Sequence, residues 1–277
     1  MSERFSSTEA PRRGDGRCLP SWLDLAGATA VVTGGGTHLG RAMATALGEL
    51  GASVHLVGRR TEVVEAAAGA LVEAGIEAIA HAMDAGDEDA MEELVHTVSG
   101  RSGSLDVFVC NAGGSTGRDQ APNVSAADLE ATLRQNVTTT VVGAQAAARV
   151  MAPRRRGAII TIGSIHGSLG SDPRLYAPGS LRSPASYHAA KGAVINLTRA
   201  LACEFAEHRI TVNCISPGQF PKPDADATTR ENFRRMVPLG RLGSPDDLKG
   251  AVALFATAAG RWVTGQNLVV DGGWSAC

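Results

Sequence analysis

The sequence predicts an α/β protein with a mostly parallel sheet that helices cover on both faces. From residue 28 onward, short apolar runs of β character alternate with Ala-rich helical stretches, which is the pattern of successive βαβ units. The first apolar run ends in a cluster of glycines, and a helical stretch follows at once. With 277 residues, of which 44% are hydrophobic, the chain is long enough to bury the core of one large domain.

Seven apolar runs are expected to be the strands of this sheet. They cover residues 29–33, 53–57, 78–81, 107–110, 158–162, 211–215 and 268–270. Because no interior linker divides them, residues 23–277 are predicted to form a single domain. Residues 1–22 are expected to be a flexible arm, because arginines and acidic residues are mixed there without the hydrophobic centre of a secretory signal.

The overall charge and the cysteines limit the classes of function. The formal net charge is -2 at pH 7, so the chain has no global positive field for nucleic acid or anionic lipid. No apolar run approaches the roughly 20 residues of a membrane span. The five cysteines are scattered without a C-x-x-C pair, which favours a reducing compartment over a disulfide frame or a zinc site. We therefore expect a cytoplasmic protein with no metal, no nucleic-acid partner and no membrane partner.

The turn after the first strand is predicted to bind a pyrophosphate. Glycines there let the backbone turn sharply and approach the phosphates, whose charge the N-terminus of the following helix favours. The run does not match the strict G-x-G-x-x-G fingerprint, and a tight turn without a ligand is the alternative. The candidate contacts are Gly34, Gly36, Thr37, His38, Leu39 and Gly40.

The residues after the second strand bear on the choice of cofactor. In a dinucleotide-binding fold, a carboxylate near this point hydrogen-bonds the adenosine ribose 2′-hydroxyl, whereas arginine suits a 2′-phosphate. Gly58 offers no carboxylate, and Arg59 and Arg60 follow it, so NADP(H) is predicted in preference to NAD(H). Two solvated arginines at a helix start are the alternative. The loops after the third and fourth strands supply the further candidate contacts Asp84, Ala85, Asn111, Ala112 and Gly113.

A tyrosine and a lysine four residues apart, Tyr187 and Lys191, lie in an Ala-rich stretch that is predicted to be helical. This spacing puts the phenol and the ammonium on one face of the helix. A phenol is a poor acid or base at neutral pH unless a nearby cation lowers its pKa, and Lys191 is such a cation. The pair alone is common in amphipathic helices. Further candidates are Ser164, after the fifth strand, and Asn136, in a helix expected over residues 125–151.

Together these motifs resemble the short-chain dehydrogenase/reductase family over about residues 23–274. The residues that carry the resemblance are the turn 33–40, Asn111 to Gly113, Asn136, Ser164, Tyr187, Lys191, Asn213, Pro217, Gly218 and the run 263–273. The resemblance implies a Rossmann-like doubly wound three-layer sandwich with a seven-stranded parallel sheet. It also implies a nicotinamide cofactor across the carboxyl ends of the strands, and a homotetramer or a dimer.

The resemblance further implies a role for each site residue. Tyr187 would exchange a proton with the substrate oxygen, and Ser164 would hydrogen-bond that oxygen. Lys191 would hold the nicotinamide ribose hydroxyls and lower the pKa of Tyr187, and Asn136 would hold a water that links Lys191 to solvent. The remaining cofactor contacts would be Asp84 and Ala85 at the adenine, Asn111, Ala112 and Gly113 at the adenosine ribose, and Pro217, Gly218 and Phe220.

Three features depart from the family pattern. His38 stands where the family usually has a glycine, so the backbone there must suit a side chain. The segment that begins at Gln219 replaces a threonine that often contacts the nicotinamide amide. Tyr187 follows Ser164 by 23 residues, whereas the family more often has about a dozen.

The extra residues before Tyr187 include a stretch over 171–183 that is rich in Pro, Gly and Ser and is predicted to be a loop beside the active site. Similar loops occur in family members that act on sugars and polyols, so the resemblance favours a polar hydroxylated substrate. Bracing of a subunit interface is the alternative. Residues 224–236 are expected to form a substrate lid with Phe233 and Met236 as apolar contacts. Candidate substrate contacts are His166, Arg174, Tyr176 and Gln219, whereas His188 is expected to face a helix or an interface.

The predicted function is an NADP(H)-dependent oxidoreductase that interconverts a secondary alcohol and a ketone by hydride transfer. Alternatives on the same fold are reduction of C=C or C=N bonds, epimerisation, and a dinucleotide-binding regulator without turnover. The intact set of Ser164, Tyr187 and Lys191 favours a catalyst over the regulator.

Overall fold

A seven-stranded parallel sheet runs through the centre of the computed structural model, which describes residues 19–115, 120–180, 182–222 and 225–277. The strands follow the order β3-β2-β1-β4-β5-β6-β7, and all neighbours are parallel. They are β1 (Thr29–Thr33), β2 (Ser53–Gly58), β3 (Ala78–Ala82), β4 (Val107–Cys110), β5 (Gly157–Ile162), β6 (Ile210–Pro217) and β7 (Asn267–Val270). Each predicted strand is present, and the predicted fold class is confirmed.

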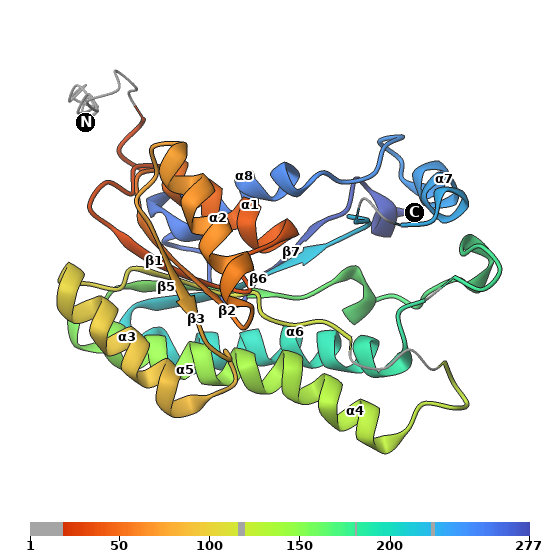
Figure 1. Cartoon of the computed structure of the whole chain (residues 1–277), viewed down its shortest axis with the longest axis horizontal. Helices are drawn as coiled ribbons and strands as arrows, with labels where there is room; N and C mark the ends of the chain where they lie inside the picture. Colours follow the sequence, from red (N-terminus) through yellow and green to blue (C-terminus); the bar gives the residue numbers. More distant parts are fainter. Residues whose placement is uncertain (1–18, 116–119, 181, 223–224) are drawn as a thin grey trace, which may run out of the picture.

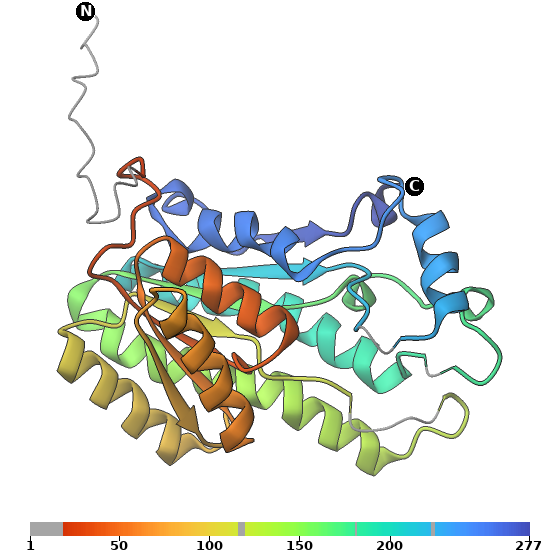
Figure 2. The same ribbon diagram turned by 45° about the horizontal axis from the view of Figure 1, so that its top comes forward.

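Helices cover both faces of this sheet, so the molecule has three layers (Figure 1). On one face lie α1 (His38–Glu49), α2 (Thr61–Glu73) and α8 (Lys249–Ala256). On the other face lie α3 (Glu88–Ser102), α4 (Ala126–Leu133), α5 (Thr139–Met151) and α6 (Ala185–Phe205). The remaining helix, α7 (Ala227–Met236), stands at the edge of the molecule beside the C-terminus (Figure 2).

Two layers of core form because the central strands are apolar on both faces. Every residue of β1 and β4 is buried, as expected for parallel strands that helices cover on each side. Val32 belongs to the cluster that also contains Met43 and Leu47 of α1. Phe108 belongs to the opposite cluster, with Met151 of α5. The strands alternate their side chains between these two clusters, which fixes their register.

The strand order changes direction at β1. This strand pairs with β2 on one side and β4 on the other, so that Ala30 lies opposite both Val54 and Val107. The chain leaves β1 toward one helical layer and leaves β4 toward the other (Figure 1). The two connections therefore diverge and open a crevice at the carboxyl ends of the strands, which is where open α/β sheets bind their ligands.

One helix differs from the sequence expectation. The helix expected over residues 125–151 is divided by a π-turn, η1 (Arg134–Thr138), which lies between α4 and α5. The hydroxyls of Thr139 and Thr140 donate to the carbonyl oxygens of Gln135 (2.9 Å) and Asn136 (2.7 Å). These bonds satisfy carbonyl groups in the wider turn, where the regular ladder is interrupted.

The start of the described chain is tied to the body of the protein. Residues 1–18 of the expected arm lie outside the described residues. The carbonyl oxygen of Trp22 accepts a hydrogen bond from the backbone N–H of Ala259 (3.1 Å), although the indole itself is exposed. Among the helices that the structure describes, none combines the length and the apolar character needed to cross a membrane.

Candidate active site

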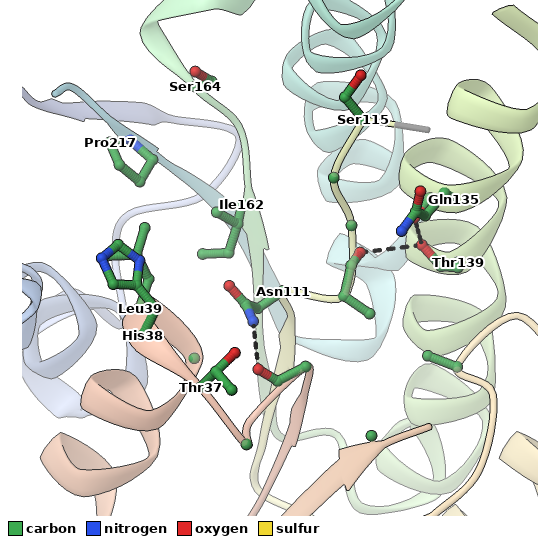
Figure 3. A pocket seen from close by; sticks show the side chains of 18 of the residues that line it. Thr37, His38, Leu39, Asn111, Ser115, Gln135, Thr139, Ile162, Ser164 and Pro217 are labelled. Atoms are coloured by element: carbon green, nitrogen blue, oxygen red, sulfur yellow. Dashed lines mark hydrogen bonds between the residues drawn. The ribbon is translucent and has the colours of Figure 1, made fainter. Parts of the chain in front are cut away.

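A cavity of about 1100 Å³ opens at the carboxyl ends of the strands, at the crevice between β1 and β4. Figure 3 shows Thr37, His38 and Leu39 on one side of it and Gln135 and Thr139 on the other. It brings together most of the predicted site residues: Gly34, Gly36, Thr37, His38, Leu39, Gly40, Arg59, Arg60, Asp84, Ala85, Asn111, Ala112, Gly113, Ser164, His166, Tyr187, Lys191, Pro217, Gly218, Gln219 and Phe220. Asn136, Arg174 and Tyr176 do not line it.

The turn after β1 approaches the cavity closely because glycines occupy positions where no side chain fits. Gly34 has a φ of 64°, and a Cβ there would lie 2.8 Å from Nδ2 of Asn111. A Cβ at Gly40 would lie 2.1 Å from the carbonyl oxygen of Gly34. The N-terminal end of α1, which has no acidic residue in its first turn, therefore faces the cavity. Such a helix end favours a phosphate group.

His38 begins α1 with a φ of 45°, in the left-handed region that histidine tolerates better than most residues. The unusual backbone angle that the sequence predicts at this position is therefore present. Burial, together with the positive charge of Lys222, lowers the pKa of the imidazole. Both effects favour the neutral ring at this end of the cavity.

Positive side chains dominate the cavity wall. Asp84 is the one carboxylate among the described residues that line it. Arg59 and Arg60 stand where β2 ends and α2 begins. This balance of charge suits a ligand with several negative groups. The basic residues of the lining are Arg59, Arg60, Arg134, Lys191 and Lys222.

Asn111 ties the end of β4 to the turn after β1. Its Nδ2 donates to the carbonyl oxygens of Thr33 (2.9 Å) and Gly34 (3.1 Å). The backbone N–H groups of Asn111 and Ala112 donate to Thr33 Oγ1 (2.9 and 3.0 Å). These bonds hold the two loops at a fixed separation, so the walls on either side of the crevice are set by one side-chain network.

Asn136 lies behind the cavity wall. It is 1% exposed, and its Nδ2 donates to the carbonyl oxygens of Gly114 (2.6 Å) and Thr132 (2.8 Å). Its Oδ1 accepts the backbone N–H of Gly114 (3.1 Å). Both amide N–H groups are thus used within the protein, and a lone pair of Oδ1 is what the side chain has left for a water. The relay role that the resemblance implies stays a prediction.

Ser164 and Tyr187, two of the candidate catalytic residues, both line the cavity. Ser164 caps the short helix η3 (Ile165–Gly167), where its Oγ accepts the backbone N–H of His166 (3.1 Å). Burial raises the pKa of Tyr187, and a hydrogen bond to Ser164 opposes that rise. Burial of the phenol thus sets the direction of the shift, and the lowering effect of Lys191 that the resemblance implies stays a prediction.

Lys191 is 6% exposed, and its Nζ lies 5.7 Å from the centroid of the Tyr187 ring. Nζ donates to the carbonyl oxygen of Ile162 at the end of β5 (2.8 Å). Burial lowers the pKa of this ammonium to about 8. Since an ammonium has three N–H groups, two remain for ligands or solvent in the cavity.

The loop between β5 and α6 packs on α7. The ring of Tyr176 meets Phe233 edge to face, with 5.2 Å between centroids. The backbone N–H of Ala177 donates to the hydroxyl of Thr229 (3.0 Å). Phe233 lines the cavity, whereas Met236 is exposed. The loop and α7 thus form one wall beside the cavity, and residue 224 of the expected lid lies outside the described residues.

Two of the four expected substrate contacts lie outside the cavity. Tyr176 packs on Phe233, which stands between that phenol and the cavity space. Arg174 is exposed and forms an ion pair with Asp172, two residues earlier, with 2.7 Å between Nη2 and Oδ2. Asp172 caps the short Pro-containing turn η4 (Pro173–Leu175), where its side chain also accepts the backbone N–H of Arg174 (2.9 Å). His166 and Gln219 line the cavity.

His188 also differs from its expected position. It faces the loop rather than a neighbouring helix, because its ring nitrogens have partners there, and its place at a subunit interface stays a prediction. Nδ1 lies 3.0 Å from the carbonyl oxygen of Leu169, and Nε2 lies 3.0 Å from Oγ of Ser171. Its ring centroid is 4.7 Å from that of His166.

Sequence reasoning missed several residues of the lining. Gln135 lies on the π-turn, and its Oε1 is the one buried side-chain oxygen or nitrogen without a partner in the described chain. Gln135 could have been identified from the sequence, because it stands beside Asn136 in the same polar run. Lys222 and Ser183 lie in irregular segments, where no periodicity predicts which way a side chain points.

The donor set of the cavity fits a nicotinamide dinucleotide. The start of α1 offers backbone N–H groups to a pyrophosphate, and the arginines at α2 offer charge to a further phosphate. The volume exceeds what a drug-sized ligand needs, so a substrate has room beside the cofactor. The candidate catalytic residues Ser164, Tyr187 and Lys191 line the same space.

Comparison with known proteins agrees with this geometry. A family model described as "Enoyl-(Acyl carrier protein) reductase" matches residues 36–275. Gluconate 5-dehydrogenase of Gluconobacter oxydans is 33% identical to the chain, over 92% of this chain and 97% of its own length. Cyclohexanol dehydrogenase of Rhodococcus sp. is 32% identical, over 91% of this chain and 97% of its own length.

The solved structures lead to the same group of proteins. The crystal structure of a gluconate 5-dehydrogenase from Burkholderia cenocepacia, in complex with NADP and tartrate, matches with a TM-score of 0.83 and 30% identity. The match covers 93% of this chain and 98% of that one. The fold, the lining of the cavity and these similarities together show that the chain belongs to the short-chain dehydrogenase/reductase family of oxidoreductases.

Proposed function

We propose that the protein interconverts a secondary alcohol and a ketone by hydride transfer with NADP(H), on a polar hydroxylated substrate. The observation that carries this proposal is that Ser164, Tyr187 and Lys191 share one cavity with the glycine turn after β1. Acid–base groups beside an anion-binding helix end are what such a reaction needs. Two relatives, named gluconate 5-dehydrogenase and cyclohexanol dehydrogenase, support the choice of an alcohol as substrate.

Tyr187 gives and takes the proton at the substrate oxygen. Its raised pKa keeps the phenol protonated at neutral pH, which suits donation to the oxygen of a ketone during reduction. Ser164 donates its O–H to the same oxygen, because its own oxygen already accepts the N–H of His166 (3.1 Å). Two donors on one oxygen stabilise the negative charge that develops there.

The cavity also supports a preference for NADP(H). A bound nicotinamide dinucleotide would supply the hydride in one direction and accept it in the other. The start of α1 would hold its pyrophosphate, and Lys191 would hold the nicotinamide ribose through its two remaining N–H groups. Arg59 and Arg60 favour a 2′-phosphate over a free hydroxyl. The Burkholderia relative whose structure contains NADP supports the same choice.

Reduction of a C=C bond is a second candidate, because the matching family model is described as an enoyl reductase. The proximity of the Ser164 and Tyr187 hydroxyls favours the ketone, since both can donate to one substrate oxygen. Product analysis with deuterium-labelled NADPH separates the candidates. Deuterium on the carbinol carbon supports the proposal, and deuterium on a saturated carbon chain or on an amine carbon contradicts it.

The test of the mechanism uses the two tyrosines of the chain. NADPH consumption is followed by absorbance with a panel of ketones, and Tyr187→Phe should lower kcat by about 10²- to 10⁴-fold because the proton donor is lost. Tyr176→Phe is the matched control, and its kcat should stay within about threefold of wild type, since Tyr176 lies outside the cavity. Full turnover by Tyr187→Phe would overturn the mechanism. NADPH binding without turnover of any substrate would favour the regulator.

The homotetramer or dimer implied by the resemblance, and the cytoplasmic location, stay predictions. Light scattering at several protein concentrations tests the assembly. A mass of one chain at all concentrations would contradict it, and fractionation of cells that make the full chain tests the location.

A further inference from the structure

A chain of hydrogen bonds connects His166 in the cavity wall to the loop and to α6. Ser171 is its centre: Oγ of this residue lies 3.3 Å from Nδ1 of His166 and 3.0 Å from Nε2 of His188. Nδ1 of His188 lies 3.0 Å from the carbonyl oxygen of Leu169. The four groups come from η3, from the loop after it and from α6, so the extra residues before Tyr187 are what assemble the chain.

The chemistry of the partners fixes the direction of each bond. A carbonyl oxygen only accepts, so His188 carries its proton on Nδ1, and in the neutral ring its Nε2 accepts. Ser171 then donates its single O–H to that Nε2. The Ser171 oxygen has lone pairs left, and it accepts the Nδ1–H of His166. The second nitrogen of His166, Nε2, is consequently left without a proton.

This unprotonated nitrogen is available to a ligand. His166 lines the cavity, and its ring meets that of Tyr187 edge to face with 6.3 Å between centroids. In the described chain, Nε2 of His166 has no hydrogen-bond partner. This atom is also not fully buried, so a ligand can reach it. Burial and the neighbouring His188 lower the pKa of His166 to about 4, so the ring is neutral at pH 7. The wall therefore presents a fixed acceptor beside the proton donor.

We propose that Nε2 of His166 accepts a hydrogen bond from a hydroxyl on the carbon next to the reacting one, so that α-hydroxy ketones and vicinal diols are preferred substrates. The inference rests on the proposed function and names its substrate class. The backbone N–H of His166 bonds Ser164 Oγ (3.1 Å) and the His166 ring meets that of Tyr187, so the imidazole lies beside a substrate oxygen that Ser164 and Tyr187 hold. Ser171 and His188 are positioning residues, because they act through the tautomer of His166.

Three ketones of one ring size test the direction of this bond: 2-hydroxycyclohexanone, 2-methoxycyclohexanone and cyclohexanone, each reduced with NADPH. The hydroxyl donates and the methoxy group only accepts, so we expect kcat/KM for the hydroxy ketone to exceed that for the methoxy ketone by about tenfold or more. In His166→Phe the ratio of the two values should fall towards one. Because it is a ratio within one variant, a general loss of activity does not affect it.

The positioning residues have their own readout in the same assay. Ser171→Ala frees the tautomer of His166 and should lower the ratio, whereas Ser171→Thr keeps the hydroxyl and should retain most of it. Equal kcat/KM values of the wild-type enzyme for the methoxy ketone and the hydroxy ketone would overturn the proposal. The proposal would also fail if His166→Phe left the ratio of these two values unchanged. Reduction of cyclohexanone without preference for the hydroxy ketone would leave the proposed function intact and remove this inference alone.

A second measurement does not depend on turnover. The nitrogen NMR signals of the histidine rings, in the full-length protein labelled at histidine, report which nitrogen carries the proton. We expect both His166 and His188 to be protonated on Nδ1, with the signals assigned from His166→Phe and His188→Phe. In Ser171→Ala the His166 signals should shift towards a mixture of tautomers. Protonation of His166 on Nε2 in the wild-type protein would overturn the proposal even if no ketone in the panel is reduced.

Discussion

Burial acts on both Tyr187 and Lys191, and it shifts their pKa values in opposite senses. It raises the pKa of the phenol and lowers the pKa of the Lys191 ammonium to about 8. Each shift favours the neutral form, because a poorly solvated site disfavours charge. In the proposed reaction, a phenol that is protonated at neutral pH would donate a proton, which favours reduction of the ketone.

The raised pKa predicts how the two directions of the reaction depend on pH. Alcohol oxidation needs the deprotonated phenol, so kcat/KM for oxidation should rise as the pH increases from about 7 to 10. Reduction needs the protonated phenol and should not rise over the same range. Steady-state rates in both directions, with the same alcohol and ketone pair, check this. An oxidation profile that is flat from neutral pH upward would show that another group accepts the proton.

The cofactor preference can be tested at one residue of the cavity wall. Arg59→Ser removes a charged donor from the end of β2, and KM for NADPH should rise about tenfold or more while KM for NADH changes little. Arg199→Ser, on an exposed part of α6, makes the same change in net charge away from the cavity and is the control. Equal effects of Arg59→Ser on the two cofactors would remove the argument for NADP(H).

At the scale of an element, the π-turn η1 connects α4 to the wall of the cavity. It places Asn136 where one side chain satisfies the N–H and carbonyl oxygen of Gly114 and the carbonyl oxygen of Thr132. A Cβ at Gly113 would lie 2.6 Å from Oδ1 of Asn136, so the loop and the amide fit together without spare room. The turn therefore supports the loop that follows β4 from behind.

This support predicts the effect of Asn136→Ala. The change removes three hydrogen bonds, one of them buried and two part-buried, which costs about 1–3 kcal/mol of folding free energy and lowers Tm by several degrees. The loop would also be held less firmly, so KM for NADPH should rise. Calorimetry and cofactor titration measure the two effects. Asn196→Ala, at an exposed position of α6, should change neither, and a wild-type Tm in Asn136→Ala would refute the bracing role.

Not all of these elements could be predicted from the sequence. The seven strands could be predicted, because each is an apolar run bounded by helical stretches. For these runs, burial in the folded protein agrees with the local sequence pattern. The division of the helix by η1 could not be predicted from hydrophobic periodicity, since it depends on where Thr139 and Thr140 find carbonyl partners. The same holds for Arg174, whose outward position results from its ion pair with Asp172 inside a short turn.

At the scale of the whole molecule, the strand order converts scattered motifs into one site. Ser164, Tyr187 and Lys191 could be selected from their order along the chain, because family resemblance preserves that order. The network through Ser171 and His188 could not, because its bonds join a loop and a helix that no local pattern relates. The sequence therefore predicts the chemistry of the cavity better than its selectivity, which depends on contacts between distant segments.

Stability at low pH should depend on a second histidine pair, remote from the cavity lining, at the edge of the sheet. Nδ1 of His55 on β2 lies 2.8 Å from Nε2 of His81 on β3, and burial lowers the pKa of both, that of His55 to about 4. The unfolded chain has the ordinary value of 6.5 and so binds protons first as the pH falls. The contribution of this pair to the free energy of unfolding is fully present above about pH 6.5. It is lost progressively as the pH falls from there through about 4.

The measurement is Tm as a function of pH, in wild type and in the double variant His55→Leu/His81→Val. The wild-type Tm should fall by several degrees between about pH 7 and 5, and the double variant should show a flatter dependence, because neither replacement takes up a proton. The slope is the readout, so a change in absolute stability does not affect the test. His96→Gln, at an exposed histidine of α3, should keep the wild-type slope. An unchanged slope in the double variant would assign the acid sensitivity to other groups.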